Sequence, residues 1–123
     1  MKIKKSEILR MTQKVHTNRI ILANFIGAVC NAVSEGTSDR YAIMILNKFN
    51  KSVKAQFPLV KYIHIRHNKV NINKAINSID SEVIAKYIKK IMSSLFSHLF
   101  MRLVKRELDV SLLHDLQDIG VKI

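Results

Sequence analysis

The sequence predicts a mainly α-helical single domain, a bundle of about five helices with one small β-hairpin at about residues 61–72. Apolar side chains recur with the 3.6-residue period of a helix over most of the chain, and the period falls to two only within that short stretch. The length of 123 residues suits one domain spanning residues 1–123. Three glycines and one proline exclude collagen-like and low-complexity classes.

Two helices are expected before Gly36. The first spans about Ser6 to His16, because a serine stands at its start and apolar residues follow at helical spacing. The second spans Arg19 to Ser34, with Thr17 or Asn18 as the cap that satisfies its first N–H groups. We expect Gly36 to end this helix in the left-handed conformation that glycine adopts without steric cost.

The second helix is apolar on nearly all sides, which is typical of a central buried helix. Residues 20–33 follow a basic segment, as in a signal peptide, but they are too few to cross a bilayer core of about 30 Å. We therefore expect a cytoplasmic protein with no integral membrane span, and the single cysteine, Cys30, agrees with a reducing compartment. Ala23, Gly27 and Asn31 form a smooth strip where another backbone could approach closely.

The third helix is expected from Asp39 to Gln56, because Thr37 and Ser38 supply cap candidates and Pro58 disfavours helix in the residue before it. It is the clearest amphipathic helix of the chain. Its apolar side consists of Ala42, Ile45, Leu46, Phe49 and Val53, and its polar side of Arg40, Asn47, Lys51 and Lys54.

A β-hairpin is expected next, because apolar and polar residues alternate over 61–65 and again over 69–72. The turn between the two strands would consist of Arg66, His67 and Asn68. The hairpin would thus place basic side chains at its tip.

A long helix is expected from Glu82 to about Leu108, with Asp80 or Ser81 as its cap. Its apolar stripe is broad enough to suggest either a homodimer seam or a central helix that neighbours contact from several sides, and the pattern does not separate the two. The candidate self-association residues are Ile88, Met92, Leu95, Phe96, Leu99, Phe100 and Leu103.

A short final helix is expected from Val110 to Ile119, capped by Asp109 and ended by Gly120. Together with the long helix it forms the candidate self-association region, residues 81–120. The remaining part of the domain, residues 1–74, is the basic half.

Positive charge is concentrated in that half. The net charge is +12, and residues 1–74 carry 14 basic and 3 acidic side chains, against 7 and 6 in residues 75–123. Such an asymmetry indicates a polyanionic partner. The alternative is compositional drift toward lysine, isoleucine and asparagine, which explains the total charge better than its uneven distribution.

Chemistry-bearing motifs are missing from the sequence. The three glycines cannot form a phosphate-binding loop or a dinucleotide fingerprint. His64 and His67 lie three apart in a predicted hairpin, so an extended chain would point them to opposite faces. Cys30 lies in the most apolar helix, where burial would raise its pKa and make the thiol inert. We therefore expect no enzymatic activity, no cofactor and no metal site.

Nucleic-acid binding is the leading functional hypothesis. Three helices followed by a hairpin is compatible with a winged helix-turn-helix, in which the third helix enters the major groove and the hairpin lies along the backbone. We expect duplex DNA as the partner and transcriptional regulation as the role. The alternative is a self-associating protein–protein interaction module with no nucleic-acid role. The candidate nucleic-acid-binding residues are Lys2, Lys4, Lys5, Arg40, Asn47, Lys51, Lys54, Arg66, His67 and Lys69.

Overall fold

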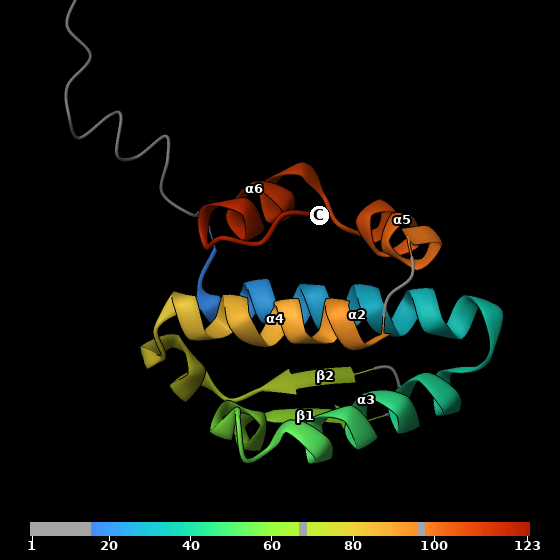
Figure 1. The fold of residues 1–123 in the computed structure, drawn as a ribbon, viewed down its shortest axis with the longest axis horizontal. Coiled ribbons are helices and arrows are strands. Elements are labelled where there is room, and N and C mark those ends of the chain that lie inside the picture. Colours follow the sequence, from blue (N-terminus) through green and yellow to red (C-terminus); the bar gives the residue numbers. More distant parts are fainter. Residues whose placement is uncertain (1–15, 67–68, 96–97) are drawn as a thin grey trace, which may run out of the picture.

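A computed structural model describes residues 16–66, 69–95 and 98–123 (Figure 1). Within these ranges the predicted fold class is confirmed, with five α-helices and one two-stranded antiparallel hairpin. The helices are α2 (Asn18–Gly36), α3 (Asp39–Val53), α4 (Ser81–Leu95), α5 (His98–Glu107) and α6 (Val110–Asp118). The strands are β1 (Ile63–Arg66) and β2 (Lys69–Ile72), flanked by the 3₁₀ helices η1 (Pro58–Tyr62) and η2 (Lys74–Ser78). The helix predicted before His16 lies outside the described residues.

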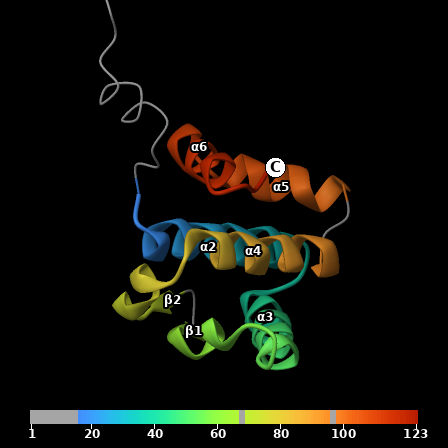
Figure 2. The same cartoon turned by 60° about the vertical axis from the view of Figure 1, so that its left-hand side comes forward.

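The elements form three layers. Helices α2 and α4 lie side by side in the centre, α5 and α6 cover one face of this pair, and α3 and the hairpin lie on the other face (Figures 1 and 2). Ile21, Leu22, Phe25, Ile26 and Val29 of α2 are almost completely buried, which confirms the central helix expected from its apolar pattern. Among the described helices, none combines the length and the hydropathy that a membrane span requires.

Side-chain caps fix several helix starts where the sequence placed them. Thr17 Oγ1 accepts a hydrogen bond from the Ile20 N–H, and Ser38 Oγ accepts one from Tyr41. Asp80 and Asp109 accept the corresponding backbone bonds at the starts of α4 and α6. These bonds satisfy N–H groups that have no partner within the helix, which is why short polar residues stand there.

The two glycines expected to end helices behave differently. Gly120 follows α6 with φ of 103°, the left-handed conformation that favours glycine, as predicted. Gly36 is the last residue of α2, so the predicted helix end is confirmed, but the predicted conformation was wrong because Gly36 does not adopt positive φ. The Thr37 N–H instead bonds the Ser34 carbonyl at 3.3 Å, and its hydroxyl donates to Val33. Those two bonds satisfy carbonyl groups in the last turn of α2, so this helix end needs no residue in the left-handed conformation.

The predicted long helix was also wrong, because its span holds two helices. Helix α4 ends at Leu95, and α5 begins at His98 and lies across the opposite side of α2 from the hairpin (Figures 1 and 2). Ile91 of α4 and Val104 of α5 are both fully buried. The broad apolar stripe therefore reflects two helices packed in different layers, each burying its own apolar side.

The candidate self-association residues consequently do not form one stripe on one helix. Ile88 is completely buried within the single chain. Phe96 and the side chain of Leu99 lie outside the described residues. The other members are half-buried and pack against the core of the same chain: Met92, Leu95, Phe100 and Leu103. The homodimer stays a prediction, but the continuous helix on which it was based is not present.

The hairpin begins two residues later than predicted, because Lys61 and Tyr62 belong to η1. The cross-strand partners are Ile63 with Ile72, His64 with Asn71, Ile65 with Val70 and Arg66 with Lys69. The isoleucines on one face are buried against α2 and α3, so the alternating pattern correctly identified the inner face. Helix α3 likewise ends at Val53 rather than Gln56.

Two polar contacts connect the layers. The Tyr87 hydroxyl of α4 donates a hydrogen bond to Asn50 Oδ1 of α3, and both side chains are buried. Burial raises the pKa of Tyr87 above its usual value. On the other side, His16 contacts the completely buried Asp115 of α6, through its backbone N–H at 2.8 Å and its Nδ1 at 2.6 Å.

Candidate nucleic-acid interface

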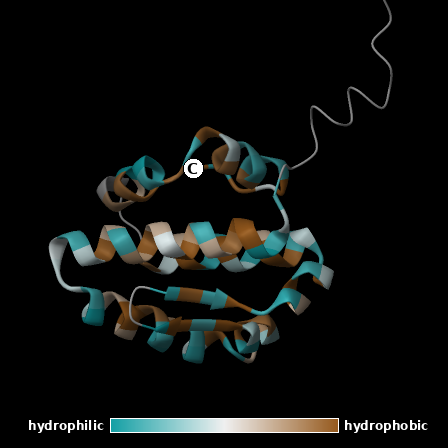
Figure 3. Cartoon of the chain, turned by 180° about the vertical axis from the view of Figure 1, so that it is seen from behind, coloured by the Kyte–Doolittle hydropathy of each residue, from teal (hydrophilic) through white to brown (hydrophobic). Residues whose placement is uncertain are grey.

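The outer side of α3 presents the polar residues predicted for it. Ala42, Leu46 and Phe49 are buried, so this side of α3 faces the core and the central helix α2. Hydrophobic and hydrophilic segments accordingly recur turn by turn along the helices (Figure 3). The opposite side faces solvent and carries exposed side chains that include Arg40, Asn47, Lys51 and Lys54, with Lys48 at its edge.

Asn47 has a structural contact as well as an exposed position. Its Nδ2 donates to the carbonyl of Ile65 at 3.4 Å and so connects α3 with β1. One amide hydrogen and the carbonyl oxygen remain available on this side chain. Sequence reasoning assigned Asn47 to base contacts and missed its part in positioning the hairpin.

The outer face of the hairpin is entirely polar. His64 and Arg66 on β1 lie opposite Asn71 and Lys69 on β2, and all four residues are exposed. Arg66 and Lys69 form a direct cross-strand pair of like charge, an arrangement that destabilises an isolated hairpin. A bound anion between the two cations would offset that repulsion.

The three layers differ sharply in charge. Residues 37–79, which form the layer of α3 and the hairpin, carry eight basic side chains and one acidic side chain. Residues 98–123, which form the layer of α5 and α6, carry four of each. The eight cations are all exposed, and they are Arg40, Lys48, Lys51, Lys54, Lys61, Arg66, Lys69 and Lys74. We call this layer, residues 37–79, the basic layer.

Acidic groups do not neutralise the basic layer. Across the described part of the chain, none of its eight cations forms an ion pair. The ion pairs of lysine and arginine lie elsewhere: Arg106 of α5 contacts Glu35 of α2 at 2.7 Å, and Lys86 lies 4.0 Å from Glu82 within α4. The positive potential of the layer is therefore open to solvent.

Two lysines that were not among the predicted residues, Lys86 and Lys90, extend this surface, whereas the Lys89 ammonium lies beside Gly120 of the opposite layer. Lys86 and Lys90 of α4 line an open depression of about 550 Å³ together with Gln56 and Phe57, just beyond the end of α3. The Phe57 and Tyr87 rings, 5.7 Å apart, hold the two segments together. The spacing of the lysines shows that they share a region of α4, but only this tertiary contact places them beside the basic layer.

The structure thus brings together six of the ten predicted residues on two neighbouring elements. Arg40, Asn47, Lys51 and Lys54 lie on α3, and Arg66 and Lys69 on the hairpin beside it (Figures 1 and 2). The other four, Lys2, Lys4, Lys5 and His67, lie outside the described residues. The order of α2, α3 and hairpin agrees with the predicted order over residues 18–72.

Cys30 shows the environment expected from the sequence. It is half-buried, and burial together with the nearby Asp39 carboxylate raises the pKa of its thiol to about 11. Such a thiol carries little thiolate at neutral pH and is a poor nucleophile. Within the described ranges, no group of three or more His, Cys, Asp and Glu side chains could hold a metal ion.

Comparison of the whole chain with protein-family models, with curated proteins and with solved structures found no match.

Proposed function

We propose that the protein binds nucleic acid through the outer surface of the basic layer, with duplex DNA as the first candidate and transcriptional regulation as the role. The observation that carries this proposal is the segregation of charge: eight exposed cations without ion-pair partners in the described structure lie on one layer, opposite a layer of balanced charge. The sequence asymmetry alone does not require the cations to lie on one side of the molecule.

The mechanism rests on phosphate neutralisation. Lys51 and Lys54 would contact phosphates and release condensed counterions, whereas Arg40 would contact base edges in the major groove. The hairpin cations Arg66 and Lys69 would contact the backbone beside it. If about six phosphates are neutralised, the logarithm of the affinity falls with the logarithm of salt concentration with a slope of roughly −5.

Like-charge repulsion on the hairpin gives additional support. Arg66 and Lys69 face each other across the ladder with no acidic neighbour paired to either in the described structure. A phosphate between them would convert a destabilising pair into an anion site. Lys86 and Lys90 of α4 would continue the track beyond the end of α3.

Paired charge reversals test the proposal. The variant Lys51→Glu/Lys54→Glu alters the basic layer, and Lys105→Glu/Lys122→Glu makes the same change in net charge on exposed residues of the α5–α6 layer. We expect the first variant to weaken binding of a fluorescent duplex at least tenfold and to reduce the salt slope by about two, one for each lost phosphate contact. The second variant should change both quantities much less.

Two outcomes of this comparison would refute the assignment of binding to the basic layer. Equal losses in both variants would mean that duplex affinity follows net charge alone and would refute the assignment to the basic layer. An unaltered affinity in Lys51→Glu/Lys54→Glu would also refute it. Arg40→Ala should change the preference among duplex sequences while leaving the salt slope nearly unchanged.

A further inference from the structure

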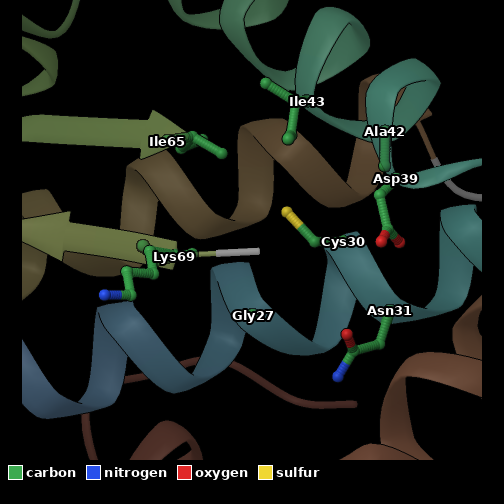
Figure 4. Close-up of a pocket in the computed structure, with 9 residues that line it drawn as sticks. Gly27, Cys30, Asn31, Asp39, Ala42, Ile43, Ile65 and Lys69 are labelled. Atoms are coloured by element: carbon green, nitrogen blue, oxygen red, sulfur yellow. The ribbon is translucent and has the colours of Figure 1, made fainter. Parts of the chain in front are cut away.

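A cavity of about 130 Å³ lies between α2, α3 and the hairpin (Figure 4). Gly27 and Cys30 of α2 form one wall, Asp39 and Ile43 of α3 another, and Ile65 of β1 contributes to a third. Its volume is close to that of an engineered protein cavity of about 150 Å³ that binds benzene. The space is therefore sufficient for a ligand of about that size.

Gly27 keeps this space open. A Cβ at this position would meet no other atom within 4 Å, so the close backbone approach expected for the strip of Ala23, Gly27 and Asn31 is not made. Glycine inside a helix costs about 1 kcal/mol of stability relative to alanine. A larger side chain at this position would enter the cavity, so Gly27 is the position at which the space can be filled.

The cavity has a mixed lining, with apolar side chains at its middle and one charged residue, Asp39 or Lys69, toward each end. Figure 4 shows the Cys30 sulfur, Ile43 and Ile65 pointing toward one another, with the Asp39 carboxylate at one side. In the described structure Asp39 forms no ion pair, and its charge acts on Cys30 across the cavity wall. Lys69 lies at the other end, and its ammonium group points away from Cys30 (Figure 4).

We propose that this cavity binds a small primary amine with a compact apolar body. The ammonium group lies beside the Asp39 carboxylate, and the apolar body packs against Cys30, Ile43 and Ile65. The carboxylate selects a cation over an anion, and the volume excludes groups much larger than a single aromatic ring.

The cavity walls also connect this site with the basic layer. Asp39 and Ile43 belong to α3, and Ile65 belongs to the hairpin, so a bound amine contacts both elements that carry the exposed cations. This step rests on the proposed nucleic-acid function. A bound amine would change the affinity of the protein for duplex DNA, and a bound duplex would change its affinity for the amine by the same factor.

Benzylamine is the probe that tests the site. We expect the unaltered protein to show saturable amide shifts around the cavity in a two-dimensional NMR titration, and Gly27→Leu, which fills the space, to abolish them. Gly36→Leu makes the same change on the same helix outside the cavity, where a Cβ also meets nothing, and should bind normally. Equal binding by Gly27→Leu, or shifts confined to exposed acidic residues elsewhere, would overturn the proposal.

The single cysteine provides a second readout. Slow modification of Cys30 by excess thiol-selective reagent near neutral pH, where the amine stays protonated, should be slowed further by saturating benzylamine in the unaltered protein and in Gly36→Leu. In Gly27→Leu the reaction should be slow from the start, because the leucine occupies the same space. Alkylation that benzylamine leaves unchanged would contradict occupancy of this cavity.

The Asp39 end is tested with Asp39→Asn and with benzyl alcohol, a neutral ligand of nearly the same shape. We expect Asp39→Asn to lower the affinity for benzylamine roughly fivefold, which is the effect of losing one exposed ion pair. The affinity for benzyl alcohol should not change. Equal effects on both ligands would refute selection of a cation.

The coupling is tested separately. A change in duplex affinity at saturating benzylamine, absent in Gly27→Leu, supports it. An unchanged affinity while benzylamine is bound overturns the coupling alone, and a protein that binds benzylamine but no duplex overturns the proposed function alone.

Discussion

At the scale of single residues, the buried polar pair of Tyr87 and Asn50 fixes how the basic layer sits on the central helices. The hydroxyl and the amide lie on α4 and α3, and neither is accessible to water. A phenol in such a place loses its proton only at a pH well above its usual value, because the anion would be desolvated. The sequence does not reveal this pair, since neither residue belongs to a recognisable motif.

The raised pKa of Tyr87 predicts loss of stability at alkaline pH. Above the usual tyrosine pKa of 10.0 the unfolded chain gives up this proton while the native protein keeps it. The unfolded state then binds fewer protons, so the free energy of unfolding falls as pH rises. Tyr87→Phe should cost about 2 kcal/mol at neutral pH, because Asn50 loses its partner, and should show a flatter decline above pH 10.

Urea denaturation at neutral and alkaline pH measures this effect. The difference between the two proteins should shrink at high pH, where ionisation in the unfolded state penalises the unaltered protein alone. Parallel pH profiles would show that the Tyr87 proton does not contribute.

The glycines give a second prediction at this scale. Gly27→Ala should raise the free energy of unfolding by about 1 kcal/mol, because the helix gains a better helix former and the new Cβ meets no atom within 4 Å. Gly120→Ala should lower it by about 1 kcal/mol or more, because its φ of 103° disfavours any side chain. Thermal unfolding monitored by circular dichroism would show shifts of opposite sign, and shifts of the same sign would contradict the backbone assignments.

At the scale of elements, local patterns predicted α2, α3, the hairpin and α6 to within a few residues. Each has a complete signal of its own, such as the Ser38 cap and the alternation of Ile63 and Ile65. The division of the long helix has no such signal, because α4 and α5 have no glycine or proline between them and their apolar residues continue at helical spacing. Which neighbour each helix meets depends on tertiary packing rather than on local sequence.

The attachment of α6 to the start of α2 provides a test at this scale. His16 donates its N–H to the buried Asp115 and contacts the same oxygen with its ring, whereas the ring of His114 lies 3.9 Å away and is more exposed. We expect His16→Ala to cost about 2 kcal/mol, because the buried Asp115 side chain loses a hydrogen-bond partner. His114→Ala should cost less than about 0.5 kcal/mol, as is usual for exposed positions.

Chemical denaturation of the two variants distinguishes these cases. Equal costs for the two histidines would mean that Asp115 does not depend on His16, and the connection between the layers would then need another explanation.

At the scale of the whole molecule, charge and packing divide the protein in two. The central helices provide the apolar core, the α5–α6 layer is electrically balanced, and the basic layer carries most of the net charge. The sequence indicated that positive charge is concentrated in its first half. In the structure, α3 and the hairpin place much of that charge in one layer. The sequence could not show that Lys86 and Lys90 of α4 adjoin that layer, because the contact of Phe57 with Tyr87 joins distant segments.

An NMR titration with duplex DNA at low salt would show which surface of the protein contacts nucleic acid. We expect amide shifts confined to α3, the hairpin and the part of α4 around Lys86 and Lys90, and we expect added salt to reverse them. Shifts concentrated on α5 and α6, or none at all at low salt, would contradict it.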